Sequence, residues 1–226
     1  MSTEPAAAKP KLLWIKLAVV VVVLATGGLL MMQGVDVRGW IDRGMNLVRS
    51  TGPVTFFTAM ALTPAVGVPA SLFTLTAGTA FGPQLGIFWV MVLCMAAILV
   101  NVALTHWLAR YALRPLLEKL MAKLGYKLPQ VAAENTTDLA ILVRVTPGSP
   151  FPVQNYLLGL AGVPLVRNLL VVFIVQLVYL PAFVLFGDAI QHGKGKVAMI
   201  ALGLLAAAGA GTHLLRKHYA KKKKAG

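Results

Sequence analysis

Residues 138–163 read DLAILVRVTPGSPFPVQNYLLGLAGV, an apolar segment that Pro147, Pro150 and Pro152 interrupt. Proline removes a backbone donor and clashes with the preceding helical turn, and it also disfavours helical backbone at the residue before it. A helix that enters this segment must therefore end near Pro147, and a new one can start near Pro152. The segment predicts a helix that is broken in the middle of an apolar run.

A second segment carries the same pattern earlier in the chain. Residues 54–82 are apolar and contain Pro64 and Pro69, and Pro147 and Pro152 each lie 83 residues after the matching proline. Glycines follow both breaks, at Gly78, Gly82 and Gly159. In both halves an amphipathic stretch precedes the broken segment and an unbroken apolar run follows it, which indicates an internal repeat.

The composition places these segments in a membrane. The 226 residues are 58% hydrophobic and 12% charged, whereas soluble domains carry roughly 25% charged residues. Four apolar runs are long enough to span a bilayer, and they cover residues 12–32, in which Lys16 is the one charge, 84–109, 166–190 and about 197–215. We interpret residues 12–32 as a retained span rather than a signal peptide, because the run is long and no small-x-small cleavage site follows it.

The distribution of Lys and Arg decides how the broken segments sit in the membrane. If each crossed it completely, residues 110–137, with five Lys and Arg, would lie opposite the Lys-rich tails. If each returns to its own side as a re-entrant hairpin, those residues and both tails lie inside, as the positive-inside rule favours. The sequence therefore predicts an all-α integral membrane protein. Its parts are four full transmembrane helices, two re-entrant hairpins in an inverted repeat, and amphipathic interfacial helices at 36–50 and within 110–137.

We expect a single membrane domain over residues 12–215, made of repeat A (36–109) and repeat B (112–190). Residues 1–11 form a polar, Pro/Ala-rich tail, and residues 216–226 form a strongly basic one.

Arg144 is the strongest candidate for a binding role. A charge inside an apolar membrane segment is costly, and its planar guanidinium matches the geometry of phosphate. A structural role, in which Arg144 satisfies carbonyls freed by the break, stays open beside it. Gln154 and Asn155 follow the break and either bind the ligand or cap the helix end. Arg110 is interpreted as an interfacial anchor with at most an ancillary role, and Asp188 as an acceptor for a basic residue.

Other polar side chains in the spans point to packing. Asn101 and Gln176 lie in the middle of predicted spans, where hydrogen bonding between helices is the expected role. The single Cys94 lies in an apolar run and is interpreted as a small packing residue.

Several function classes are disfavoured. The formal net charge is +14, but the Lys and Arg lie between apolar runs and in the tails, so we interpret them as topology signals and expect no nucleic acid partner. The four histidines are scattered without Asp or Glu at metal-ligand spacing, and nucleotide-binding glycine loops and a serine nucleophile elbow are absent. We therefore predict no enzyme, no cofactor and no metal.

Residues 144–159, RVTPGSPFPVQNYLLG, resemble the signature of the DedA and SNARE-associated Golgi protein superfamily (the VTT domain) at Arg144, Pro147, Pro150, Asn155 and Gly159. Residues 64–86, PAVGVPASLFTLTAGTAFGPQLG, resemble its first-half motif. The resemblance covers about residues 50–190. It implies two facing re-entrant hairpins that move undecaprenyl phosphate or phospholipids between leaflets.

The chain departs from that family pattern at one point. DedA proteins proper carry acidic residues in the first hairpin, thought to couple transport to protons, whereas residues 54–82 contain no Asp or Glu. The resemblance is therefore closer to the Tvp-like branch.

These observations predict a transporter or scramblase for lipids whose head group carries a phosphate, such as phospholipid or undecaprenyl phosphate. An ion or small-solute carrier and a non-transporting scaffold or assembly factor stay open, as does a homo-oligomer. The short basic tails and the lack of sorting signals favour a bacterial inner membrane, with both termini in the cytoplasm.

Overall fold

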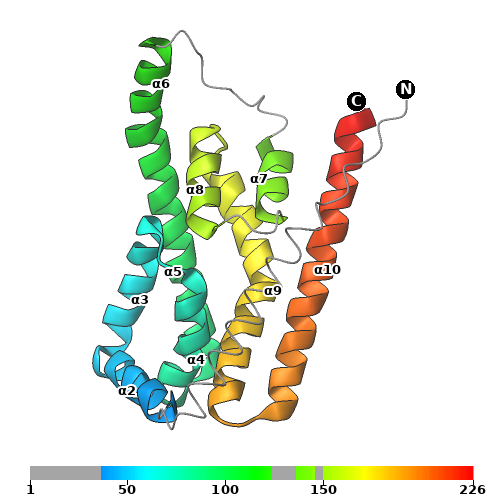
Figure 1. Cartoon of the computed structure of the whole chain (residues 1–226). Coiled ribbons are helices and arrows are strands. Elements are labelled where there is room, and N and C mark those ends of the chain that lie inside the picture. Colours follow the sequence, from blue (N-terminus) through cyan, green and yellow to red (C-terminus); the bar gives the residue numbers. More distant parts are fainter. Residues whose placement is uncertain (1–36, 124–135, 146–149, 226) are drawn as a thin grey trace. The chain divides into compact units, whose positions relative to one another are not determined.

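The computed structural model describes residues 37–123, 136–145 and 150–225 (Figure 1). The chain divides into two compact units, residues 1–47 and residues 48–226, and each is described by itself. In the first unit, the described residues form the start of α2 (Val37–Ser50), so the helix predicted at 36–50 is confirmed. The predicted tail at 1–11 and the predicted span at 12–32 lie outside the described residues.

The first proline pair breaks the chain where the sequence predicts. In the second unit, α3 (Gly52–Leu62) ends just before the 3-10 turn η1 (Thr63–Val66), and α4 (Ala70–Leu85) begins directly after Pro69. Gly67 lies between them with φ of 104°, a left-handed conformation that glycine adopts without steric cost. The 11 residues of α3 reach about 16 Å, roughly half of a 30 Å hydrocarbon core.

The second broken segment is also confirmed as two short helices. α7 (Thr136–Val145) and α8 (Phe151–Leu160) have 10 residues each and reach about 15 Å. Pro150 is the N-cap residue of α8, and Pro147 lies outside the described residues. The α3–α4 pair and the α7–α8 pair lie toward opposite ends of the second unit in Figure 1.

Long helices connect and flank the broken pairs. α5 (Ile87–Trp107) continues through the π-helical turn η2 (Leu108–Leu113) into α6 (Arg114–Lys123), and α9 (Leu165–Gln191) and α10 (Gly195–Ala225) follow the second pair. Within the described part of the chain, three helices are long and apolar enough to cross a membrane, beginning at Ile87, Leu165 and Gly195. The predicted spans at 84–109 and 166–190 and the final apolar stretch are thus confirmed as helices.

Two helices extend beyond the apolar runs predicted for them. The helix predicted within residues 110–137 is present as α6, and it continues from α5 because η2 widens the helix locally instead of ending it. The helix that contains the final apolar stretch continues past Leu215 to Ala225, since its basic end contains no Pro and is rich in the good helix formers Lys and Ala.

The outer faces of the long helices expose large apolar side chains. They include Phe88, Trp89, Ile174, Met199 and Ile200, each at least 60% exposed. Soluble monomers rarely expose apolar surface on this scale, whereas lipid accepts it without cost. Together with the apolar helices, this surface identifies an all-helical membrane protein.

Glycine lets α4 and α9 cross closely. A Cβ atom on Gly187 would overlap the backbone carbonyl of Leu75, and one on Gly78 would lie 2.8 Å from the carbonyl oxygen of Val184. The two helices pack over a long shared length. The function of Gly78 in the first broken segment is therefore close helix packing.

A proline inside α4 leaves one backbone carbonyl without its helical donor, and a distant arginine supplies a donor instead. Pro83 has no N–H, so the carbonyl of Thr79, four residues earlier, lacks its helical donor. Arg49 at the end of α2 donates from Nη2 to that oxygen at 3.1 Å. The contact ties the start of the second unit to α4.

Candidate functional site

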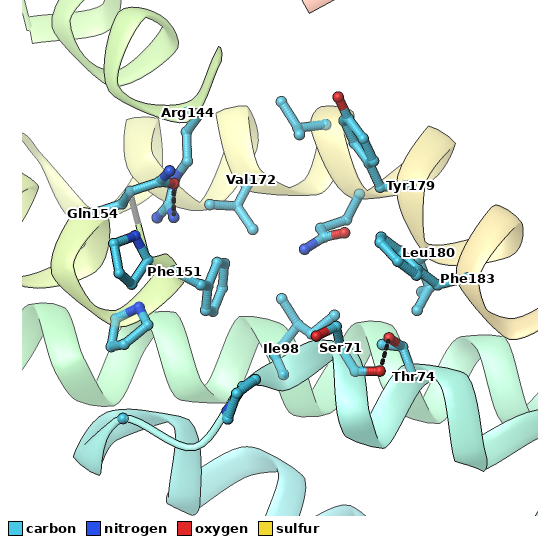
Figure 2. Close-up of a pocket in the computed structure, with 17 residues that line it drawn as sticks. Ser71, Thr74, Ile98, Arg144, Phe151, Gln154, Val172, Tyr179, Leu180 and Phe183 are labelled. Carbon is cyan, nitrogen blue, oxygen red and sulfur yellow. Dashed lines mark hydrogen bonds between the residues drawn. The ribbon is translucent and has the colours of Figure 1, made fainter. Parts of the chain in front are cut away.

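A cavity of about 330 Å³ lies where the two proline breaks meet. Pro69, Ala70, Ser71 and Thr74 line it from the first broken segment, and Pro150, Phe151, Pro152 and Gln154 line it from the second. α9 closes one side with Val172, Val175, Gln176, Tyr179, Leu180 and Phe183, and α5 contributes Ile98. Figure 2 shows Arg144 and Gln154 at one end of this cavity, with Tyr179 and Phe183 at the other.

Neutral amides hold the guanidinium of Arg144 in place. Its Nη2 donates to Asn155 Oδ1 at 2.6 Å and to Asn168 Oδ1 at 3.1 Å, and its Nη1 donates to Gln154 Oε1 at 3.3 Å. The ring of Phe151 lies 5.2 Å from the guanidinium carbon, a cation–π distance. None of these groups carries a negative charge, so the positive charge of Arg144 is not neutralised by them.

One donor of Arg144 has no partner among the described residues. Its Nε is buried and forms no hydrogen bond with the residues that the structure describes. Leaving a buried donor unpaired costs about 1–3 kcal/mol, and more when the group is charged. An unpaired donor on a buried cation beside a cavity favours an anionic acceptor in that cavity.

A relay of amides connects Arg144 to the first broken segment. Asn155 Nδ2 donates to Asn101 Oδ1 at 3.3 Å, and Asn101 Nδ2 donates to the backbone oxygen of Ala61 at 2.8 Å. The two ends determine how the amides are oriented, because a guanidinium only donates and a carbonyl only accepts. The helix end that Pro64 frees in α3 is thereby satisfied from α5.

A second branch of the network runs to a histidine. Asn168, which is fully buried near the start of α9, places its Nδ2 3.5 Å from His106 Nδ1 in the last turn of α5. Arg144 thus connects α7, α8, α9 and α5 through side chains that come from both halves of the chain.

The structure brings together the three residues proposed from the sequence to bind substrate, Arg144, Gln154 and Asn155. Asn155 is fully buried and is joined to Asn101, so the interhelical bonding predicted for Asn101 is confirmed. Gln176 lines the cavity.

The residues assigned to the hairpins have separate positions. Pro69, Pro150 and Pro152 line the cavity, and Pro64 is buried in η1. Gly159 lets α8 approach α5, since a Cβ there would lie 3.0 Å from the His106 carbonyl oxygen. A Cβ on Gly82 would have only ordinary contacts, so the structure gives no steric reason for glycine there.

Two residues considered ancillary lie apart from the cavity. Asp188 is at the end of α9, where Lys194 and His192 pair with it at 3.0 Å, so its predicted basic partner is confirmed. Arg110 lies in η2, near Arg114 and the turn at Gly162. Neither lines the cavity.

Sequence reasoning missed Asn168 and His106. Asn168 follows Arg167 at the start of a span, where a polar residue is ordinary, and His106 lies among apolar neighbours without a recognisable motif. One usable signal was that both are polar side chains within predicted membrane spans, where a buried amide or imidazole needs a hydrogen-bond partner. In the described part of the chain, no group of three His, Cys, Asp or Glu could hold a metal ion.

A family comparison covers this part of the chain. The VTT domain model matches residues 68–189, more than half of the 226 residues. The chain belongs to the VTT domain family. This is the domain of the DedA and SNARE-associated Golgi proteins, a family of membrane proteins. The match runs from just before α4 to near the end of α9, and it contains Arg144, its amide partners and the cavity-lining residues from Pro69 to Phe183. Neither a curated protein nor a solved structure matches the chain significantly.

Proposed function

We propose that this VTT-domain protein moves lipids with a phosphate-bearing head group between the two leaflets, and that Arg144 binds the phosphate. One observation carries the proposal. Both proline breaks line a single cavity, and among the described residues its cation contacts neutral amides and one aromatic ring, with its buried Nε left unpaired.

The cavity suits a head group and not a whole lipid. Its volume of about 330 Å³ is at the lower end of the range for small-molecule sites. Ser71, Thr74 and Gln176 supply hydrogen-bonding groups, while Phe151 and Phe183 supply apolar wall. In this mechanism the head group crosses through the cavity while the acyl chains stay in lipid.

The charge of the cavity-lining residues indicates which class of ligand the cavity binds. Of the residues that the structure describes around the cavity, Arg144 is the charged one, so an anion is the complementary ligand. An arginine fork binds phosphate oxygens in pairs, which gives orientation as well as affinity. Phospholipids and undecaprenyl phosphate both carry this group.

The short helices support a membrane arrangement for this mechanism. We propose that α3–α4 and α7–α8 are re-entrant hairpins that enter from opposite sides, with their tips at the cavity, and that four full spans surround them. An inverted pair of broken helices is how many transporters build a site near the bilayer midplane. Within this proposal the protein resides in a bacterial inner membrane with both termini in the cytoplasm.

Reconstituted vesicles test the role of Arg144. The wild-type chain is expected to move fluorescent phosphatidylglycerol and a fluorescent prenyl phosphate across the bilayer, measured by chemical quenching of the outer leaflet. Arg144→Gln removes the charge and is expected to slow transfer about tenfold or more, since hydrogen bonds to charged groups contribute about 1.5–3 kcal/mol. Arg144→Lys keeps the charge without the fork, and an intermediate rate is expected.

Lys119→Gln is the matched control, because it removes one positive charge from an exposed site on α6. Its rate is expected to equal that of the wild type. A full rate for Arg144→Gln would reject the phosphate-binding role, and flux of inorganic phosphate without lipid transfer would favour a small-solute carrier.

A further inference from the structure

His106 ends the network that starts at Arg144. It lies in the last turn of α5 and is 2% exposed. A single amide, that of Asn168, stands between the two residues: its Oδ1 accepts from Arg144 Nη2 at 3.1 Å, and its Nδ2 lies 3.5 Å from His106 Nδ1.

The donor pattern of this chain determines the state of the imidazole. Arg144 has only donors, so the amide oxygen of Asn168 must face it and the amide nitrogen must face His106. His106 Nδ1 must then accept a hydrogen bond. This arrangement fits a neutral imidazole that carries its proton on Nε2.

We propose that His106 is a proton-binding residue that controls how firmly Arg144 is held, so that binding of a phosphate head group at Arg144 is coupled to uptake of one proton at His106 Nδ1. The inference rests on the proposed function and adds to it the ion that accompanies the lipid.

The coupling follows from the shared amide. When Nδ1 takes a proton from water it becomes a donor, and the nitrogen of Asn168 can no longer face it. The amide must turn its oxygen toward His106, which presents its nitrogen to Arg144 and removes one acceptor from Nη2. The released N–H can then donate to a phosphate oxygen.

Linkage makes the effect reciprocal. A phosphate that draws the guanidinium away from Asn168 leaves the amide oxygen free to accept from protonated His106. Anion and proton therefore bind together and leave together. The proton returns to water when the head group departs, and a monoanionic phosphate plus one proton adds no net charge to the site.

The charged groups around His106 favour strict coupling between proton uptake at His106 and anion binding at Arg144. Arg110, one turn further along the helix, acts on His106 electrostatically, and Arg144 is reached through Asn168. Protonation without an anion would add a third positive charge to this region, while protonation with an anion would not.

The other elements packed against α5 are poor in ionisable groups. α3, α4 and η1 carry none, α8 carries Tyr156, and η2 adds Tyr111. α9 carries Arg167, Tyr179 and Asp188. Asp188, the carboxylate in that set, pairs with Lys194.

Nitrogen NMR of the full chain tests the protonation state directly. The four histidines are labelled with ¹⁵N, and His106 is assigned by the loss of its signals in His106→Asn. We expect a neutral ring protonated on Nε2 in the empty protein at pH 7, and a doubly protonated ring when dihexanoyl phosphatidic acid is bound. A proton on Nδ1 in the empty protein, or bound phosphatidic acid without proton uptake, would overturn the coupling. Absence of phosphatidic acid binding by calorimetry would instead overturn the anion site itself.

Transfer rates against pH give the second test. Wild-type transfer of fluorescent phosphatidylglycerol is expected to rise as pH falls from 8.5 to 5.5, by at most about tenfold per pH unit, the limit for one proton. His106→Asn keeps an acceptor for Asn168 but cannot titrate, so its profile is expected to be flat. Asn168→Ala leaves His106 in place but cuts its connection to Arg144, and a flat profile is expected there too.

His192→Asn is the matched control, since His192 is exposed at the end of α9 and distant from the network in sequence. It is expected to keep the wild-type profile. Wild-type pH dependence in His106→Asn would overturn the inference while leaving lipid transfer intact, whereas a wild-type chain that moves no lipid would overturn the proposed function.

Discussion

The hydroxyl of Tyr156 in α8 donates a 3.0 Å hydrogen bond to the backbone oxygen of Ala65, which lies 91 residues earlier in η1. Ala65 belongs to the turn that Pro64 and Pro69 create, so its carbonyl has no regular helical donor. The second broken segment thus supplies a group that the first one lacks. Asn101 does the same for Ala61 from α5. The first break is therefore stabilised by side chains from α8 and α5, which satisfy its free carbonyls.

Removal of the Tyr156 hydroxyl tests this relation. Tyr156→Phe keeps the ring and leaves the Ala65 carbonyl without this donor, so we expect a loss of about 1–2 kcal/mol in the free energy of unfolding. Denaturant titration of the detergent-solubilised protein measures it. Tyr111→Phe is the control, since Tyr111 is 63% exposed, and an equal loss in both variants would contradict the role assigned to Tyr156.

Gly187 tests the close approach of α4 and α9. Its Cβ in Gly187→Ala would overlap the Leu75 carbonyl, and we expect destabilisation of about 1–3 kcal/mol because backbone must move. Gly203→Ala in α10 is the matched substitution in open space, and helix propensity predicts a gain of about 0.5–1 kcal/mol. Thermal unfolding separates the two, and stabilisation by Gly187→Ala would refute the packing.

The pair of Arg49 and Pro83 gives a double-mutant test. Arg49→Ala leaves the Thr79 carbonyl unpaired, with an expected loss of about 1 kcal/mol. In a Pro83→Ala background the helix regains its own N–H for that carbonyl, so Arg49→Ala is expected to cost little. The coupling energy from the four unfolding curves measures the interaction, and strictly additive effects would show that Arg49 does not replace the missing donor.

Labelling of introduced cysteines tests the hairpins. Thr51 and Gln84 are exposed and flank the α3–α4 pair, so Thr51→Cys and Gln84→Cys are expected to react with a membrane-impermeant thiol reagent from the same side. Lys123→Cys and Pro164→Cys are expected to react from the other side. Cys94 is buried and gives a low background. Reaction of Thr51→Cys and Gln84→Cys from opposite sides would mean that α3–α4 is one complete span, and the facing-hairpin arrangement would be wrong.

Part of the candidate site was accessible from the sequence because its determinants are local. Arg144 is conspicuous in an apolar run, and Gln154 and Asn155 lie only 10 and 11 residues after it, across the same break. The partners of Arg144 were not accessible in this way. The structural alternative expected it to bind backbone carbonyls freed by its own break, whereas its partners among the described residues are side-chain amides. The carbonyls that Asn101 and Tyr156 satisfy belong to the first break.

What the sequence by itself determined was where the chain is helical, where it breaks and which segments are apolar enough for lipid. Those properties depend on proline's missing donor and on runs of neighbouring side chains, and both act over a few residues. Only the tertiary structure decided that Asn168 stands between Arg144 and His106, which are 24 and 62 residues from it in the chain. Such contacts depend on how each helix is rotated about its axis and how closely two helices approach, as at Gly187. Those variables are settled by the packing of the whole bundle.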